Sequence, residues 1–487
     1  MISLIAFRNI IYRPWRSVLL FFGYGVGVGV MIVLLSVGEA LLTQARDEKL
    51  VGGGSITVLP QGLDVEVMKT GGVGGLFFSI DQARFIYDQL LTSPRLRSSV
   101  SATAPQIEGR LLYLRTMKGN EYTVRANGEI PSRTRAVRGP VGLASGEWQD
   151  DDHDRRWMTP TLAELRDDID HFHMPPPGAA NLDTWAEWHY FNIVSPDRKK
   201  WAFITLMVGG DVTSSKWRGG VLVTTREEGK RSSRFEAQIP RENVRFSTTS
   251  ANLELASSSV KVLSNGDYRV IAGARGDDGP VSVDLVVHPA ARAYFPGASF
   301  GTDEFVSGYT VPGLRASASG SICVAGKCER YDAAQSYHDH NWGVWRGVTW
   351  DWGASRAGAF TILYGRVIAP KAMREAPLFV YVVDSLGFRA VFRPASISYV
   401  DGRTAMVGGR EIRVPSRAVF ADVRGADTLR VELNIEDAIA TDTREGSQKQ
   451  DYGLPYFIQM KGIATVSGRI GGELVSGSGT GFFETYR

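Results

Sequence analysis

The 487-residue sequence has little net charge and lacks the nucleotide-binding motif of an ATPase. Its 55 Lys and Arg residues nearly balance its 52 Asp and Glu residues, which leaves a formal charge of +3. No strong field is therefore available to attract the phosphates of a nucleic acid. No Walker A motif occurs either. The sequence gives no reason to expect a nucleic-acid partner or ATP hydrolysis.

Cysteine is also scarce, because only Cys323 and Cys328 are present, in "SICVAGKCERYD". A turn-like Val-Ala-Gly-Lys separates them, so a hairpin would bring the two side chains within bonding distance. A disulfide would imply an oxidising compartment. Two unpaired thiols are the alternative, and no second Cys or His pair stands nearby at zinc-like spacing.

Long apolar runs are missing except for one, the 22 uncharged residues from Ser17 to Gly38. Such a helix would be about 33 Å long, enough to cross a hydrocarbon core. Three arginines precede it, and the positive-inside bias places them in the cytoplasm. A cleaved signal peptide is the alternative, but its apolar part is usually shorter, about 7 to 15 residues. We expect a cytoplasmic N-terminus (1–16), one transmembrane helix (17–42) in the inner membrane, and an extracytoplasmic remainder.

Several N-terminal segments resemble MacB-type ABC transporter permeases. They are "RNIIYRPWRSVLLFFGYGVGVGVMIVLLSVGEAL", "GGGSITVLPQG", "FSIDQARFIYDQLLTSPRL" and "ATAPQIEGRLLYL". The resemblance covers about the first 145 residues and lacks the three later membrane helices of such permeases. It implies a permease-like extracytoplasmic module over 43–145 and association with an ABC transport system. Gly25 and Gly29 would offer a small-residue face to another membrane helix.

The next segments predict a small α+β module followed by an entry segment. "DQARFIYDQLLT" has apolar residues at helical spacing, and "RLLYLRTM" and "EYTVRA" alternate as strands do. The helical "TLAELRDDIDHF" then stops at Pro175–Pro177, so 146–184 is interpreted as an entry segment outside the core. His171 and His173 are interpreted as surface or packing residues.

From Trp185 onward the chain reads as short strands separated by Gly, Asn and Asp turns, such as the hairpin signal "SNGDY". The 54 glycines and 11 tryptophans suit tight turns and aromatic interiors. The fold class is therefore mainly β. We expect two antiparallel barrels or sandwiches, over 185–318 and 319–487.

Four motifs in this region resemble the AttH family of tandem lipocalin-like proteins, which includes carotenoid 1,2-hydratase, also called hydroxyneurosporene synthase. They are "WAEWHYFN", "YHDHNWGVW", "WDWG" and the terminal "GTGFFE", and the resemblance covers about 150–487. It implies lipocalin-like β domains that hold a hydrophobic lipid or isoprenoid. For the hydratase, it also implies addition of water to a C=C bond without a cofactor.

Strand periodicity in "YHDHNWG" puts Tyr337, Asp339 and Asn341 on one face and His338, His340 and Trp342 on the other. Resemblance to the hydratase makes Asp339 the proton donor, and aromatic faces would stabilise the resulting cation. The candidate catalytic residues are Asp339, His338, His340 and Tyr337. The candidate ligand-binding residues are Trp185, Glu187, Trp188, His189, Tyr190, Trp342, Trp345, Trp350, Trp352 and Tyr364.

Two other interpretations of this stretch remain open. A metal ion would use His338 and His340 with His189 or Glu187, but His-x-His is a weak pattern, and we predict no metal and no cofactor. The same residues could instead close the barrel, with Asp339 satisfying its neighbours. "LYGRV" also departs from the hydratase pattern, because Arg366 stands where another acid is expected.

The sequence therefore predicts a membrane-anchored, extracytoplasmic, lipocalin-like protein that binds a hydrophobic molecule beside an ABC transporter. The alternative is a hydratase-like enzyme that hydrates, isomerises or cyclises an unsaturated lipid or isoprenoid.

Overall fold

The computed structural model describes residues 12, 14–47, 80–138, 149–176, 178–302, 305–368, 378–407, 409–444 and 454–487. The chain divides into two compact units. One comprises Met1–Phe78 and Val100–Arg155, and the other comprises Ser79–Ser99 and Arg156–Arg487. The predicted class is confirmed, because the described residues form two large antiparallel sheets, an apolar N-terminal helix and a small α+β region.

The first unit contains the apolar helix α2 (Pro14–Asp47), whose segment Pro14–Val37 is long and apolar enough to cross a membrane. A membrane anchor and a signal sequence share this length and composition, so the predicted topology stays a prediction. Residues 48–79, which carry part of the permease resemblance, lie outside the described residues.

The hairpin of β1 (Gln106–Arg115) and β2 (Glu121–Glu129) confirms the two predicted strands, and α5 (Pro131–Arg138) follows it. The predicted amphipathic helix is α4 (Ile80–Thr92). It belongs to the second unit, although its sequence position groups it with 43–145. Phe85 of α4 packs edge-on against Tyr294, with ring centroids 4.1 Å apart.

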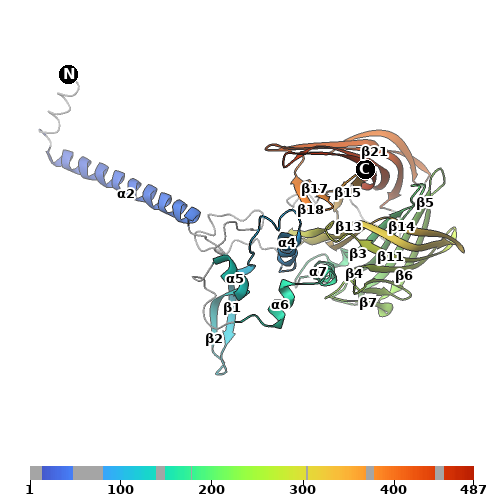
Figure 1. The fold of residues 1–487 in the computed structure, drawn as a ribbon, viewed down its shortest axis with the longest axis horizontal. Coiled ribbons are helices and arrows are strands. Elements are labelled where there is room, and N and C mark those ends of the chain that lie inside the picture. Colours follow the sequence, from blue (N-terminus) through green and yellow to red (C-terminus); the bar gives the residue numbers. More distant parts are fainter. Residues whose placement is uncertain are drawn as a thin grey trace, which may run out of the picture. The chain divides into compact units, whose positions relative to one another are not determined.

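The first sheet of the second unit has twelve strands (Figure 1, green to yellow). They are β3 (Trp185–Val194), β4 (Lys200–Asp211), β5 (Lys216–Glu227), β6 (Ser233–Pro240), β7 (Val244–Phe246), β8 (Leu253–Leu255), β9 (Ser258–Val262), β10 (Tyr268–Gly276), β11 (Gly279–Pro289), β12 (Phe295–Thr302), β13 (Phe305–Val324) and β14 (Lys327–Val344). Because β10 pairs with both β11 and β6, the strands β3, β4, β5, β6, β10, β11, β13 and β14 close into a ring.

The second sheet has nine strands in the order β18-β17-β16-β15-β23-β22-β21-β20-β19 (Figure 1, orange to red). They are β15 (Thr349–Ala357), β16 (Phe360–Ile368), β17 (Phe379–Asp384), β18 (Gly387–Phe392), β19 (Ser398–Val407), β20 (Arg410–Arg424), β21 (Asp427–Asp442), β22 (Tyr456–Ile470) and β23 (Glu473–Tyr486). The hydrogen-bonded order of these strands leaves β18 and β19 at its ends.

The junction between the two sheets lies later than the sequence predicts. The predicted boundary at 318/319 falls inside β13, and the first sheet continues to the end of β14. The reason is long-range pairing, because β14 returns beside β3 with His340 opposite His189. The tip of the β13–β14 hairpin carries the Cys323–Cys328 disulfide.

The interpretation of 146–184 as a segment outside the core is wrong. Two helices, α6 (Asp152–Met158) and α7 (Leu162–Ile169), form here, with short turns η1 (Leu182–Thr184) and η2 (Arg241–Asn243) further on. A capping box between Thr161 and Glu164 starts α7. Arg166 and Ile169 are buried. The Arg166 guanidinium donates hydrogen bonds to the backbone carbonyls of Gly266, just before β10, and Pro289, at the end of β11. Helical periodicity alone did not reveal this buried face.

Glycines give aromatic rings room to lie flat across neighbouring strands. Gly365 is opposite Trp352 in the β15–β16 register, and a Cβ atom on Gly365 would come 2.4 Å from Trp352 Cζ3. Gly308 accommodates the Trp342 ring in the same way. These contacts place two large aromatic side chains that could not pack against a bulkier partner.

Substituting Gly365→Ala should lower the free energy of unfolding by about 1 to 3 kcal/mol, because overpacking forces Trp352 away from its position. Gly273→Ala is the matched control, since a Cβ atom there meets nothing within 4 Å. Denaturant unfolding of the two variants measures the difference. Equal stability of both variants would contradict this account.

Candidate functional site

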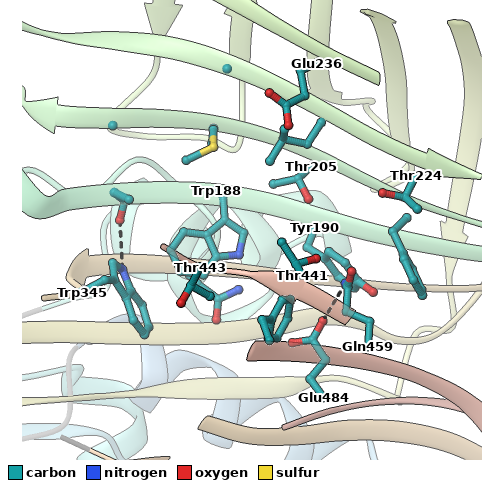
Figure 2. A pocket seen from close by; sticks show the side chains of 18 of the residues that line it. Trp188, Tyr190, Thr205, Thr224, Glu236, Trp345, Thr441, Thr443, Gln459 and Glu484 are labelled. Carbon is teal, nitrogen blue, oxygen red and sulfur yellow. Dashed lines mark hydrogen bonds between the residues drawn. The ribbon is translucent and has the colours of Figure 1, made fainter. Parts of the chain in front are cut away.

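A cavity of about 1550 Å³ lies between the two sheets of the second unit. One wall comes from β3 to β6 and β14, and the other comes mainly from β15 and β21 to β23. Figure 2 shows Trp188 and Tyr190 of the first sheet on the opposite side from Gln459 and Glu484 of the second. The site is thus built where the two sheets meet.

Aromatic rings cover part of the cavity wall. The Trp188 ring lies 4.8 Å from Trp345 and 6.4 Å from Trp350, measured between centroids. Trp350 also packs edge-on against Tyr486 at 4.9 Å. Such rings bury apolar ligand surface, and their faces stabilise a nearby positive charge.

Asp339 points to this cavity from β14. It is 4% exposed and lies directly across from Tyr190 in the β14–β3 register. Its Oδ1 accepts a hydrogen bond from Asn341 Nδ2 at 2.7 Å, and within the described ranges no Lys or Arg pairs with it. Burial raises the pKa of Asp339 to about 7, while a hydrogen bond to Tyr337 opposes the rise and the charge of Glu484 adds to it. A carboxyl with this pKa can donate a proton near neutral pH.

Glu484 of β23 is a second carboxyl in the same cavity. Its Oε2 accepts from Trp350 Nε1 at 2.8 Å, and its Oε1 accepts from Gln459 Nε2 at 3.2 Å. Burial raises the pKa of Glu484, and these two hydrogen bonds oppose the rise. The pKa of Tyr190 is raised well above its usual value by burial, and then by the charges of Glu484 and Asp339. The tyrosine is therefore close to both acids.

The opposite face of β14 carries a separate, buried polar cluster. Asp170, which follows α7, is its centre and is fully buried. The Asp170 carboxylate accepts from Tyr268 Oη at 2.5 Å and bonds His340 Nδ1 at 2.6 Å, while His338 Nε2 lies 3.4 Å away. Burial alone would raise the pKa of Asp170, but hydrogen bonds from the two histidines hold it well below the usual value.

Glu187 extends this cluster toward the surface through His173. The Glu187 carboxylate accepts the His173 backbone N–H at 2.8 and 3.0 Å, and the His173 ring stacks on Trp342 with centroids 3.5 Å apart. His340 Nε2 lies 3.0 Å from Glu187 Oε1 but outside hydrogen-bond geometry, so this contact is an ion pair. Burial opposes protonation of His340, yet Asp170 and Glu187 raise its pKa to about 9.

Two groups in this cluster have donor atoms close enough to surround a cation: Asp170, His189 and His340, and His173, Glu187 and His340. His340 thus lies close to His189 and to Glu187, the two predicted third ligands of a metal ion. His338 instead contacts the Tyr190 carbonyl and Asp170. His340 already contacts a carboxylate through each ring nitrogen, Asp170 through Nδ1 and Glu187 through Nε2. We interpret the cluster as a network that fixes 170–173 against β3 and β14.

The predicted site residues divide between the two faces. Those that line the cavity are Trp185, Trp188, Tyr190, Asp339, Trp345, Trp350 and Trp352. Those in or beside the polar cluster are Glu187, His189, His338, His340 and Trp342. Tyr337 accepts a hydrogen bond from Trp352 Nε1 at 2.9 Å. Tyr364 lies apart from both, in the core of the second sheet against Phe420.

The sequence analysis missed Glu484, Gln459, Asp170, Tyr268 and the cluster role of His173. Glu484 had a signal, because it ends the quoted run "GTGFFE". The others had none, since their roles depend on contacts between distant segments. Arg366 stands where the hydratase pattern has another acid. Its Nη2 donates a hydrogen bond to Asp351 Oδ2 at 2.5 Å, so it pairs with the buried Asp351 carboxylate of the second sheet.

Substituting Asp170→Asn should lower the free energy of unfolding by about 3 to 5 kcal/mol, because it removes the buried charge that pairs with His340. Asp284→Asn, which removes an exposed ion pair with Arg269, should cost less than about 1 kcal/mol. Chemical denaturation of both variants measures the two costs. Equal costs would show that Asp170 is not the centre of the cluster.

The contribution of Glu484 to the stability of the protein should fall as the pH rises above about 4.5, the ordinary range of a glutamate. The folded protein keeps the Glu484 proton at a pH where the unfolded chain has released it, so rising pH favours unfolding. Glu484→Gln should therefore match the wild type at pH 4 and exceed its melting temperature at pH 8. Glu236→Gln, on the same cavity, is the control; identical pH profiles for all three proteins would contradict the prediction.

No family model and no curated protein matches the sequence. The solved structures that are similar include three that are each matched over 65% of this chain. A putative AttH from Nitrosomonas europaea is 16% identical, covered over its full length, with a TM-score of 0.44. Kievitone hydratase from Nectria haematococca is 15% identical and covered over 94%, with a TM-score of 0.43. CghA, solved with Sch210972, is 12% identical and covered over 96%, with a TM-score of 0.41. This is a similarity of fold, and it assigns no activity to the chain.

Proposed function

We propose that the second unit is a hydratase-type enzyme that protonates a C=C bond of a lipophilic, unsaturated molecule held between the two sheets. Asp339 is the proton donor. The observation that carries this proposal is a buried carboxyl without a paired Lys or Arg in the described part of the chain, set in the wall of an aromatic cavity.

The chemistry of an isolated alkene explains why this combination matters. Protonation by the Asp339 carboxyl forms a C–H bond and leaves a carbocation on the neighbouring carbon. Trp188, Trp345 and Trp350 offer ring faces that stabilise the cation. Capture by water forms a C–O bond and releases a proton, so the net reaction is addition of water. Loss of a proton instead would give isomerisation, and attack by another C=C bond would give cyclisation.

The lining of the cavity favours a long molecule of lipid or isoprenoid type. Its volume of about 1550 Å³ exceeds that of usual small-molecule sites, roughly 300 to 1000 Å³. Asp339 and Glu484 lie among aromatic rings, while the charged residues Lys216, Arg346 and Asp183 line other parts of the cavity. An amphipathic molecule with a polar end and an unsaturated chain would match both environments.

A carrier that binds such a molecule without changing it is the second candidate. The apolar helix α2 favours it, because an anchored binding domain could receive a lipid from the bilayer. Under this proposal the chain sits in the inner membrane with its bulk outside the cytoplasm and works beside an ABC transporter. The permease-like N-terminal sequence supports that association. The same anchor would equally supply an enzyme with its substrate.

Incubating the full chain with linear isoprenoids such as farnesol and squalene in ¹⁸O-labelled water should give labelled alcohols. Asp339→Asn should reduce labelling at least 100-fold, since general acids contribute about 10²- to 10⁴-fold. Asp284→Asn, an exposed acid that does not line the cavity, should leave labelling unchanged. Mass spectrometry measures the incorporated oxygen.

A carrier gives a different result in the same preparation. Organic extraction of the wild type and of Asp339→Asn would release the same unmodified lipid, and neither protein would incorporate label. That outcome would reject the enzyme. An extract without any lipid, together with no label, would reject both candidates.

A further inference from the structure

Glu484 faces the same cavity as Asp339, and the proton transfer described above does not use it. Resting on the proposed hydratase function, we propose that Glu484 is a second catalytic residue, which holds the attacking water and accepts its proton. One sheet would then supply the acid and the other sheet the base.

The position of Glu484 suits contact with a bound water. Its side chain is partly exposed, and it lines the cavity. Trp350 Nε1 and Gln459 Nε2 each occupy one carboxylate oxygen, at 2.8 and 3.2 Å. A carboxylate has about four lone-pair directions, so two remain for a water. Two donors from separate strands fix the carboxylate, and Figure 2 shows Gln459 bonded to Glu484 beside Tyr190.

The strand register brings Glu484 near Asp339 although the residues lie on different sheets. Glu484 lies opposite Trp352 in the β15–β23 register. Trp352 Nε1 in turn donates to Tyr337, which is two residues from Asp339 on the same strand face. The charges of both acids act on Tyr190, which lies opposite Asp339 on β3. A substrate between the two sheets could therefore touch both carboxyls.

The two acids also have different partners, which suits different roles. The donors to Glu484 stabilise its charged form, whereas Asp339 is more deeply buried and accepts from Asn341. Nearby carboxylates in a site of low polarity disfavour simultaneous ionisation, so the pair tends to keep one proton. Asp339 can hold that proton while Glu484 stays ionised.

The complete step balances in atoms and charge. The Asp339 proton and the π electrons form the new C–H bond, which leaves Asp339 as a carboxylate. The oxygen of the water held by Glu484 attacks the cation, and Glu484 takes the released proton. Transfer of that proton back to Asp339 through cavity water restores the starting state, with one water added to the substrate.

A purely structural role for Glu484 is the competing explanation, because its carboxylate also accepts hydrogen bonds from two partly buried donors. Deuterium and oxygen labels distinguish the roles. In D₂O containing H₂¹⁸O, protonation puts deuterium on carbon, and water capture puts ¹⁸O on carbon. The full chain is tested with farnesol and squalene as Glu484→Gln, with Glu236→Gln on the same cavity as the matched control.

The wild type and Glu236→Gln should incorporate both labels. Glu484→Gln should still exchange deuterium into recovered or isomerised alkene but lose ¹⁸O incorporation at least 100-fold. Retention of full ¹⁸O incorporation by Glu484→Gln would overturn the inference and leave the proposed function intact. Loss of both labels by a variant with an unchanged melting temperature would also overturn it, because protonation does not need the base. Absence of both labels from the wild type would reject the proposed function and the inference together.

Discussion

The enclosure of two carboxyls where two β sheets meet, Asp339 buried and Glu484 partly exposed, is the constraint on which the rest of the site depends. Asp339 comes from β14 and Glu484 from β23, and each reaches the cavity only because the sheets pack together. Burying a carboxyl without a cation is unfavourable, and a fold selected for stability alone would avoid it. Perturbed acids in a cavity are therefore a physical reason to look for chemistry there.

The buried cluster behind β14 supplies the rigidity that such a site needs. Asp170 and Glu187 hold His340 between two carboxylates, and Arg166 contributes a second buried cation near Asp170. These contacts tie the segment after α7 to the back of the strand that carries Asp339. A catalytic carboxyl has to stay within a fraction of an ångström of its position, and a packed network on the reverse face restricts that strand.

Much of this arrangement could be predicted from local sequence, because strands alternate with a period of two residues. The alternation in "YHDHNWG" correctly separates Asp339 from His338 and His340. The junction between the sheets could not be predicted, since it depends on β14 pairing with β3 across more than a hundred residues. The role of Asp170 could not be predicted for a similar reason. The sequence of α7 is polar, and the residues that contact Arg166 and Asp170 lie in distant segments. Glu484 could have been predicted most easily, because it ends the motif "GTGFFE" that carries part of the family resemblance.

The central claim is that a neutral carboxyl persists in this cavity near neutral pH. Infrared spectroscopy of the full chain in D₂O measures it directly, through the C=O stretch of a protonated carboxyl in a difference spectrum between wild type and Asp339→Asn. The account predicts that the wild type has this band at pH 6, that Asp339→Asn lacks it, and that it disappears as the pH rises past about 7. A wild-type spectrum without the band at pH 6 would contradict the account, because Asp339 would then be an ordinary ionised carboxylate.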